Sequence, residues 1–193
     1  MTKEQKGIIL AMSIGDAHLS KSLDKRWNTE SYSISLNHGE KQYEYIKWKS
    51  HIINSILGGK QSVPKKFDNN GFIGYRYSKT SKKLKPLYNL LYKNKKKVIS
   101  DKVLKYFTPL CLAIWYMDDG CLYAHKRNGK IHAYEMKIST CFTERDKLLP
   151  IVEYFKNTYD INFRINVEHK KYYSLVCATR EIRKFMKIFI SPC

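Results

Sequence analysis

The sequence predicts an α+β protein built from two tandem copies of one unit, each running helix, strand, strand, helix, strand, strand, helix. Three observations support this prediction. Helical and strand patterns recur in the same order at an offset of roughly one hundred residues. The predicted strands alternate apolar and polar residues, which is typical of half-buried antiparallel sheets. An almost wholly apolar helix opens each copy, and we expect the copies to occupy residues 1–97 and 98–193.

Each opening helix carries a recognisable start signal. Thr2 followed by Gln5 forms a capping pattern, and Thr108-Pro109 places proline at the first helical position of the second copy. Apolar residues then cover nearly every side, so both helices should be buried. The first runs into Gly15-Asp16 and the second into Asp118-Asp119-Gly120.

The remaining elements follow in the same order in both copies. The expected strands hold Tyr32, Ile34 and Leu36, then Ile73, Tyr75 and Tyr77; in the second copy, Tyr134, Met136 and Ile138, then Ile161, Phe163, Ile165 and Val167. The middle helix of the first copy is expected to carry its apolar face on Tyr45, Trp48, Ile52 and Ile56, and that of the second copy on Leu148, Val152, Phe155 and Tyr159. We expect Thr143 to cap the second of these helices, and Pro150 to kink it or to delay its start. The closing helices are expected to bury Leu84, Leu87 and Leu91 in the first copy, and Ile182, Phe185 and Phe189 in the second. The basic residues 93–97 are expected to connect the two copies.

Composition narrows the partners. Lysine and arginine number 36 against 17 acidic residues, a net charge of +19, so nucleic acid is the first expected partner and an anionic membrane surface the second. The longest apolar run, residues 110–117, is too short to span a bilayer, and we expect no leader. The cysteines are odd in number and lack a C-x-x-C pair, and no histidines have metal-ligand spacing, which argues against disulfides and structural zinc and favours a reducing compartment.

The two helix ends point to a metal site. Gly7, Ala11 and Gly15 form a row of small residues, so we expect the opening helices to cross closely and to bring Asp16 and Asp119 together. Two carboxylates at helix C-termini repel each other and the helix dipoles. Divalent cations held by these hard oxygen ligands remove both penalties, and Mg²⁺ suits them best. The alternative is that Asp-Asp-Gly is an ordinary helix stop, but two equivalent copies favour the metal interpretation.

The stretches from Ile9 to Ala17 and from Leu112 to Gly120 resemble the two signature motifs of LAGLIDADG homing endonucleases of the single-chain, two-motif type. The resemblance covers the whole chain. It implies a pseudo-twofold fold with a two-helix interface, and two sheets that form a saddle in the DNA major groove. It also implies a monomer that cuts both strands of a long asymmetric site, encoded by a mobile intron or free-standing, in a bacterial or phage cytoplasm or an organelle.

The same resemblance assigns roles to individual residues. Asp16 and Asp119 match the metal-binding acidic positions, and the carbonyls of Gly15 and Asp118 match the secondary ligands; two or three Mg²⁺ ions are implied, with Mn²⁺ as a substitute. Lys97 matches a basic residue that stabilises the transition-state phosphate, although a solvated linker lysine is an equal alternative. The corresponding position of the second half would be 195, beyond Cys193. Either Lys187 substitutes, the second lysine is missing, or the chain is shortened, so nicking and double-strand cleavage both stay open.

The polar strand faces carry the residue types that read bases. The expected DNA contacts are Asn162, Arg164 and Asn166, joined by Ser33, Ser35, Asn37, Arg76, Ser78, Lys79, Lys137 and Ser139. The alternative for each residue is a solvated outer sheet face. Two rival functions remain at this point: an RNA-binding intron maturase, and a DNA-binding protein of the same fold that does not cut.

Overall fold

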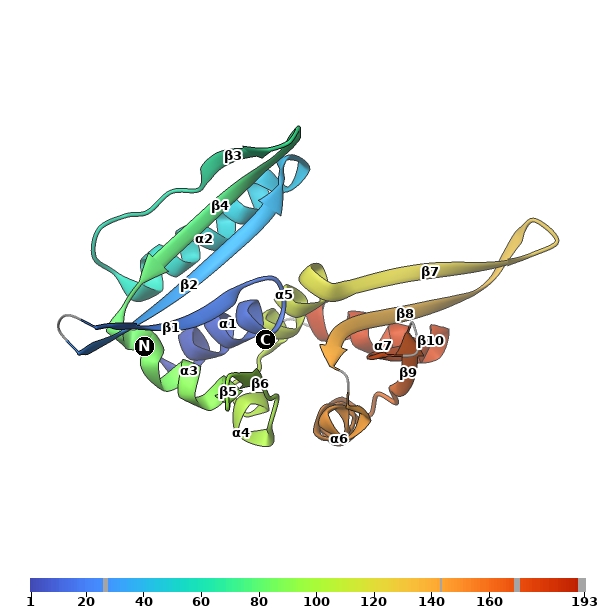
Figure 1. The fold of residues 1–193 in the computed structure, drawn as a ribbon. Helices are drawn as coiled ribbons and strands as arrows, with labels where there is room; N and C mark the ends of the chain where they lie inside the picture. The colour runs from blue at the N-terminus through green and yellow to red at the C-terminus, as the bar shows by residue number, and fades with distance from the viewer. Residues whose placement is uncertain (26–27, 143, 169–170, 191–193) are drawn as a thin grey trace. The chain divides into compact units, whose positions relative to one another are not determined.

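The computed structural model describes residues 1–25, 28–142, 144–168 and 171–190, and Figure 1 traces their fold. The chain divides into two compact units, Met1–Lys97 and Val98–Cys193. Within the described residues, no helix is long and apolar enough to cross a membrane.

Unit 1 contains a four-stranded antiparallel sheet in the order β1-β2-β4-β3. Its main elements are α1 (Lys3–Ile14), β1 (His18–Asp24), β2 (Thr29–Gly39), α2 (Tyr43–Leu57), β3 (Lys65–Asn69), β4 (Phe72–Thr80) and α3 (Lys85–Leu91), with 3₁₀ turns at Glu40–Gln42 and Lys82–Leu84. A short hairpin of β5 (Tyr92–Lys93) and β6 (Lys96–Lys97) closes it.

Unit 2 repeats this arrangement with the sheet order β7-β8-β10-β9. Its elements are α4 (Asp101–Leu104), α5 (Pro109–Asp119), β7 (Gly120–Arg127), β8 (Lys130–Phe142), a 3₁₀ turn (Arg145–Leu148), α6 (Leu149–Tyr159), β9 (Arg164–Glu168), β10 (Tyr172–Ala178) and α7 (Thr179–Ile190). The expected α+β fold with two antiparallel sheets is therefore confirmed, and both units follow the order helix, strand, strand, helix, strand, strand, helix.

Local capping explains where the opening helices begin. The Thr2 hydroxyl accepts a hydrogen bond from the Gln5 backbone N–H at 3.1 Å, and the Gln5 side chain accepts one from the Thr2 backbone N–H at 2.9 Å. This reciprocal pair satisfies two of the donors that a helix start leaves open. In α5, Thr108 accepts from the Cys111 N–H at 3.4 Å, and Pro109 occupies the first turn. Both predicted helix starts are confirmed.

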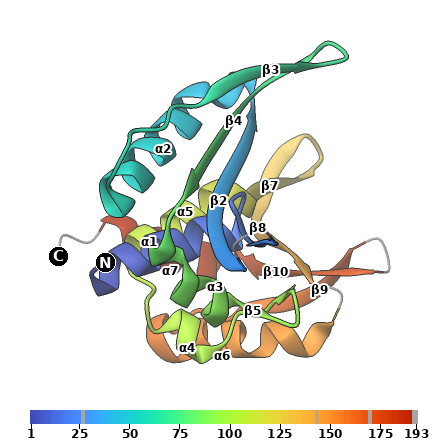
Figure 2. The same ribbon diagram turned by 60° about the vertical axis from the view of Figure 1, so that its left-hand side comes forward.

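The core of unit 1 lies between α2 and one face of its sheet, as Figures 1 and 2 show. Tyr32, Ile34 and Leu36 of β2 are buried there, and the intervening residues of the strand are not. The predicted apolar face of α2 is confirmed in part. Ile56 is buried as expected, together with Ile46 and Ile53, whereas Trp48 is exposed and stacks on Tyr45. The helix also buries Lys49, whose charge is compensated by the Asp16 carboxylate, as described below.

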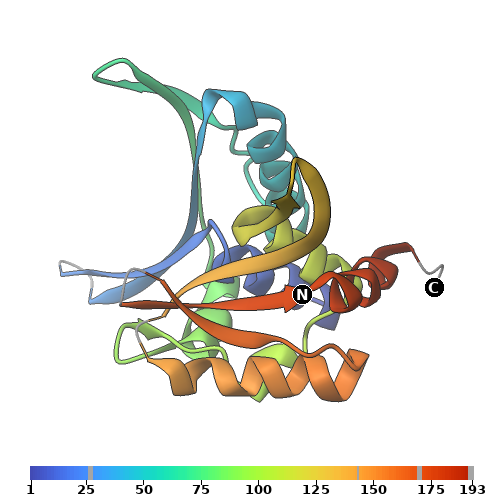
Figure 3. The same cartoon turned by 90° about the vertical axis from the view of Figure 1, so that its right-hand side faces the viewer.

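An aromatic cluster fills the core of unit 2. Trp115 of α5 stacks near Phe155 of α6, which also contacts Phe163 and Phe185, and all four side chains are buried. Figure 3 shows α6 and α7 beside the strands that they cover. Pro150 lies in the first turn of α6, after the 3₁₀ turn, so the late helix start is confirmed. The proposed Thr143 cap lies outside the described residues.

The basic residues that connect the two repeats, 93–97, form a short hairpin of β5 and β6. Asn94 and Lys95 turn the chain between β5 and β6 with left-handed backbone conformations (φ 49° and 61°). Lys97 thereby lies at the end of a paired strand, in unit 1, rather than in a free linker.

Candidate functional site

Asp16 lies just beyond the C-terminus of α1. Gly15 caps this helix, and its N–H donates to the Ala11 carbonyl at 3.1 Å. One Asp16 carboxylate oxygen, Oδ2, is 3.8 Å from Lys49 Nζ and 3.9 Å from His38 Nδ1, and the Asp16 side chain remains 32% exposed. A carboxylate at the negative end of a helix dipole is unfavourable by itself. Here a neighbouring cation offsets that cost while one side of the carboxylate stays accessible.

Lys49 and His38 form the buried wall behind Asp16. The Lys49 side chain is fully buried, and its Nζ lies 4.2 Å from the centre of the Tyr45 ring, in cation–π geometry. His38 Nδ1 is 3.2 Å from Gln42 Oε1, and its Nε2 is buried with no hydrogen-bond partner in the described part of the chain. Neither residue is predicted from the sequence, because a lysine and a histidine on amphipathic elements ordinarily face solvent.

Lys97 reaches the same end of α1. Its Nζ donates to the Ile14 carbonyl at 2.9 Å. The β5–β6 hairpin therefore delivers an ammonium group to a helix C-terminus, where a cation is favourable. Unit 1 thus gathers Asp16, Gly15 and Lys97 around one helix end, although they come from segments more than eighty positions apart.

Asp119 is the last residue of α5, and it is oriented by its own helix. Its Oδ2 accepts a hydrogen bond from the Trp115 indole Nε1–H, one turn earlier, at 3.1 Å. Gly120 then ends the helix under the ring of Tyr116, so closely that a Cβ atom at position 120 would overlap that ring. Burial beneath this turn raises the pKa of the Tyr116 hydroxyl. Asp118 precedes these residues and is half-buried.

The donor set at the two helix ends fits Mg²⁺. Each end offers a carboxylate that is not fully buried, together with main-chain carbonyls one residue earlier. Among the described residues, no group of three or more histidine, cysteine or acidic side chains forms a metal cage. Mg²⁺ typically takes one or two protein carboxylates and completes its shell with water and substrate phosphates. Lys187, the alternative second lysine, lies exposed on α7.

Five of the six predicted contact residues of unit 1, all except Lys79, share one sheet face. The register pairs Ser35 with Ser78 and Asn37 with Arg76 across β2 and β4. Arg76 Nε also donates to Asn37 Oδ1 at 3.1 Å, which fixes the guanidinium over the sheet. Ser33 continues the same face. The register adds the residues that the sequence analysis missed there, namely Ser20, which bonds Ser33 at 2.8 Å, and Thr80.

Four of the predicted contact residues of unit 2, those within β8 and β9, also share a face, but acidic residues lie among them. Lys137 and Arg164 both pair with Val176 of β10, and Ser139 and Asn166 both pair with Ser174. Lys137 Nζ is 3.2 Å from Glu168 Oε1, and Arg164 Nη2 is 3.8 Å from Glu135 Oε2. Part of the positive charge on this face is therefore balanced within the protein.

Lys79 does not belong to the polar face, and its assignment as a DNA contact is corrected. It has the same strand parity as the buried Tyr77 and is only 8% exposed. Its Nζ donates to Asn54 Oδ1 at 2.8 Å and to the Lys60 carbonyl at 2.9 Å, on the α2 side of the sheet. The tyrosine hydroxyl donates to the same Asn54 oxygen at 3.2 Å. Strand alternation, applied strictly, predicts this burial.

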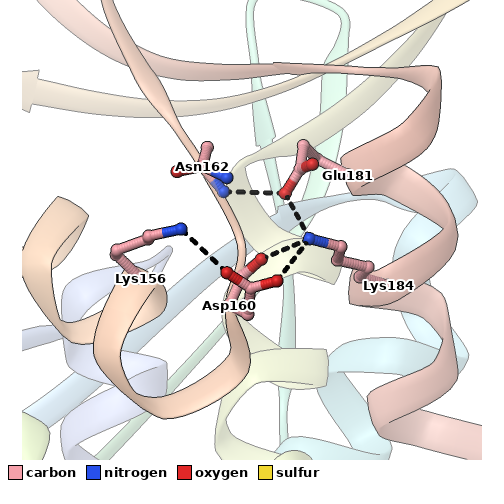
Figure 4. A network of polar contacts seen from close by, with 5 residues as sticks. All are labelled: Lys156, Asp160, Asn162, Glu181 and Lys184. Atoms are coloured by element: carbon pink, nitrogen blue, oxygen red, sulfur yellow. Dashed lines mark hydrogen bonds and ion pairs between the residues drawn. The ribbon is translucent and has the colours of Figure 1, made fainter.

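The predicted place of Asn162 on a strand is corrected, because this exposed residue precedes β9; its role as a DNA contact stays a prediction. Figure 4 shows it in a polar cluster that joins the end of α6 to α7. The Asn162 backbone N–H donates to Glu181 Oε2 at 2.8 Å, and Lys184 Nζ lies 2.8 Å from Asp160 Oδ2. Hydrogen bonds from Lys156 and Lys184 lower the pKa of the Asp160 carboxyl to about 2. The polar residues of this cluster connect the C-terminal end of α6 to α7.

Comparison with known proteins agrees with this architecture. Among solved structures, the homing endonuclease I-WcaI bound to its DNA recognition sequence has a TM-score of 0.76 at 19% identity, covering 99% of this chain and 84% of that one. I-DmoI in complex with DNA and Mn has a TM-score of 0.58 at 14% identity, covering 99% of both chains. At these identities the likeness establishes the fold.

Curated relatives match only over part of their length. The chain is 28% identical over 171 residues to Protein RecA of Mycobacterium shimoidei, which covers 86% of this chain and 38% of that protein. It is 31% identical over 121 residues to Protein RecA of Mycolicibacterium flavescens, covering 62% and 26%. The chain thus spans well under half the length of these relatives. By contrast, the model of the LAGLIDADG DNA endonuclease family matches residues 6–185, which is nearly the whole of this chain. This chain therefore belongs to the LAGLIDADG DNA endonuclease family.

Proposed function

We propose that this chain is a monomeric, site-specific endonuclease that hydrolyses phosphodiester bonds in a long asymmetric DNA duplex, with Mg²⁺ as cofactor. One observation carries the proposal: the same unit occurs twice, and in each copy an acidic residue lies at the C-terminal end of the apolar opening helix, Asp16 just after α1 and Asp119 as the last residue of α5. Two carboxylates in equivalent positions suit a reaction that treats two strands in the same way. The solved structures of the fold include complexes with DNA and with Mn, which supports the assignment.

In this proposal, Asp16 and Asp119 hold two or three Mg²⁺ ions with help from the Gly15 and Asp118 carbonyls. When bound there, the metal would supply an activated water and charge compensation for the leaving oxygen. Lys97 faces the developing negative charge of the phosphate in the first half, because its ammonium lies at the same helix end as Asp16. Trp115 holds the Asp119 carboxylate in one orientation through its indole N–H.

The two polar sheet faces read the DNA sequence in the major groove. The face of unit 1 is rich in serine, with Asn37 and Arg76 at its centre, whereas the face of unit 2 carries Lys137, Arg164 and Asn166. Arginine suits guanine and asparagine suits adenine. Because the faces differ, the preferred site is asymmetric. The net charge of +19 supplies the sequence-independent attraction to phosphates.

The test is selection of cleaved sites from a random duplex library with Mg²⁺, followed by cleavage assays on the recovered site. We expect Asp16→Asn and Asp119→Asn each to abolish measurable cutting, and Lys97→Met to slow it by roughly 100- to 1000-fold, the usual loss for one transition-state donor. Asp146→Asn, which changes an exposed acidic residue of the 3₁₀ turn, is the matched control and should cut normally. Ca²⁺ in place of Mg²⁺ should permit binding without cutting.

Undiminished cutting by Asp119→Asn would refute the assigned role. Tight DNA binding with no Mg²⁺-dependent nicking would identify a DNA-binding protein of this fold without catalytic activity. Preference for intron RNA over duplex DNA would identify a maturase. Cutting of one strand alone would show that the second half lacks a group equivalent to Lys97.

A further inference from the structure

Lys49 is the fully buried basic residue closest to the proposed catalytic centre, and the proposed function assigns it no role. Its side chain has no exposed surface, and its helix α2 buries it between Ile46 and Ile53. A buried ammonium is costly unless a carboxylate or an aromatic face compensates it. The structure supplies both: Asp16 Oδ2 at 3.8 Å and the Tyr45 ring at 4.2 Å.

We infer that Lys49 is a positioning residue that serves as a built-in counter-cation for Asp16. It holds the carboxylate at the end of α1 in one orientation before any metal ion arrives. The inference rests on the proposed function only in taking Asp16 as a metal ligand. The ion pair itself is a property of unit 1.

The arrangement has a consequence for metal loading. Because Lys49 already compensates the charge of Asp16, a divalent cation at this carboxylate gains less than it would from an uncompensated one, and the ammonium repels it. Unit 1 should therefore bind a divalent ion weakly in the absence of DNA. Phosphate oxygens of the bound duplex then supply the additional negative charge and ligands that make the site competitive. Lys49 thus couples metal loading to substrate binding.

Position 49 has a counterpart in unit 2 that lacks the charge. Lys49 lies nine residues before Gly58, which ends α2, and Ile151 lies nine residues before Asp160, which ends α6; both terminal residues have left-handed backbones (φ 68° and 52°). Ile151 is fully buried, so an apolar residue is accommodated at this depth in the same fold. Methionine, which preserves the length of lysine, is therefore a suitable replacement for Lys49.

A thermal-stability cycle in EDTA tests the ion pair without any substrate. We expect Asp16→Asn to lower Tm by roughly 6–20 °C, because it removes the carboxylate that compensates the charge of a buried ammonium. Lys49→Met should leave Tm within about 3 °C or raise it, since apolar replacement of a buried charge is often neutral or stabilising. The double variant should return to the Tm of Lys49→Met. If Asp16 served only as a metal ligand, Asp16→Asn would be harmless in EDTA and the inference would fail.

Lys47 provides the matched control, because it lies on the same helix and its side chain is 58% exposed. Lys47→Met combined with Asp16→Asn should show the full loss of Tm, without rescue. Rescue by this control would overturn the specific pairing of Lys49 with Asp16.

Calorimetric titration of the DNA-free protein with Ca²⁺ separates positioning from stability alone. We expect Lys49→Met to tighten Ca²⁺ binding by on the order of 10-fold, because a like charge beside the ligand is removed. Lys47→Met should leave the affinity unchanged. Equal or weaker Ca²⁺ binding by Lys49→Met would overturn the coupling to metal loading. Neither the Tm cycle nor the Ca²⁺ titration measures DNA cleavage. The role of Lys49 and the proposed nuclease activity can therefore fail independently of each other.

Discussion

Removal of the two carboxylates from the polar face of unit 2 should strengthen DNA binding and make it more sensitive to salt. Glu168 lies 3.2 Å from Lys137, and Glu135 lies 3.8 Å from Arg164. The Lys137 and Glu168 side chains are only 20% and 23% exposed, so solvent screens this pair incompletely. In the double variant Glu135→Gln/Glu168→Gln, both cations become available to phosphates while the hydrogen-bonding shape of the side chains is kept.

The size of the effect follows from counterion release. Each additional phosphate contact changes the slope of log K against log salt by about −0.9, so two contacts change it by about −1.8. At a salt concentration of ~0.1 M, the same relation gives an affinity gain of roughly 60-fold. Fluorescence anisotropy on a duplex of arbitrary sequence, in EDTA, measures the slope without knowledge of the target site.

The control must change the net charge equally on a surface away from the polar face. Glu44 on α2 is 79% exposed and pairs with Lys47 at 3.5 Å, and Glu153 is exposed on α6. Glu44→Gln/Glu153→Gln should raise affinity only modestly and leave the slope nearly unchanged. If both double variants give the same slope, the face formed by β8, β10 and β9 does not lie against the DNA and the interface is wrongly assigned.

Three further outcomes test particular parts of the fold. Lys79→Met should lower the free energy of unfolding by ~1–3 kcal/mol in urea titrations, because it removes a buried hydrogen-bond partner of Asn54, and it should leave the salt slope of DNA binding unchanged. Gly120→Ala should lower the free energy of unfolding by ~1–3 kcal/mol, because the added Cβ overlaps Tyr116; a loss below about 0.5 kcal/mol would contradict the close approach. The folded pKa of Asp160, about 2, lies below the ordinary value of 3.8, so its contribution to stability is present above pH 3.8 and is lost as pH falls towards 2. Asp160→Asn should therefore lower Tm at pH 5 but not at pH 2, whereas an equal loss at both values would exclude an electrostatic origin.

The sequence was most informative where the local pattern and the final environment agree. The Thr2 cap, the alternating face of β2 and the late start of α6, with Pro150 in its first turn, are all set by neighbours within a few residues. Such features depend on backbone geometry and on the period of side chains, which the sequence displays directly. The repeated order of elements followed from the same signals.

The misassigned residues have long-range partners. Lys49 is buried because Asp16, thirty-three positions earlier, lies beside it, and Lys79 is buried because Asn54 accepts its hydrogen bond. Residue type alone assigns both lysines to solvent, because it does not register the tertiary partner that makes burial tolerable. For Lys79 this expectation outweighed the strand alternation, which places position 79 on the buried face. Asn162 was placed on a strand because its neighbours alternate, but the structure begins β9 two residues later.

The anchoring of β4 has a consequence for how target preference can change. Tyr77 and Lys79 attach this strand to Asn54 of α2, while Arg76 and Ser78 point to the opposite face. Residues that hold the strand and residues that face a ligand therefore alternate along one short segment, and they share no side-chain hydrogen bonds with each other. Under the proposed function, variation at the outward positions would change which base pairs are preferred without loosening the scaffold. A lineage that meets a new insertion site can in this way adapt by single substitutions, each of which leaves a folded protein.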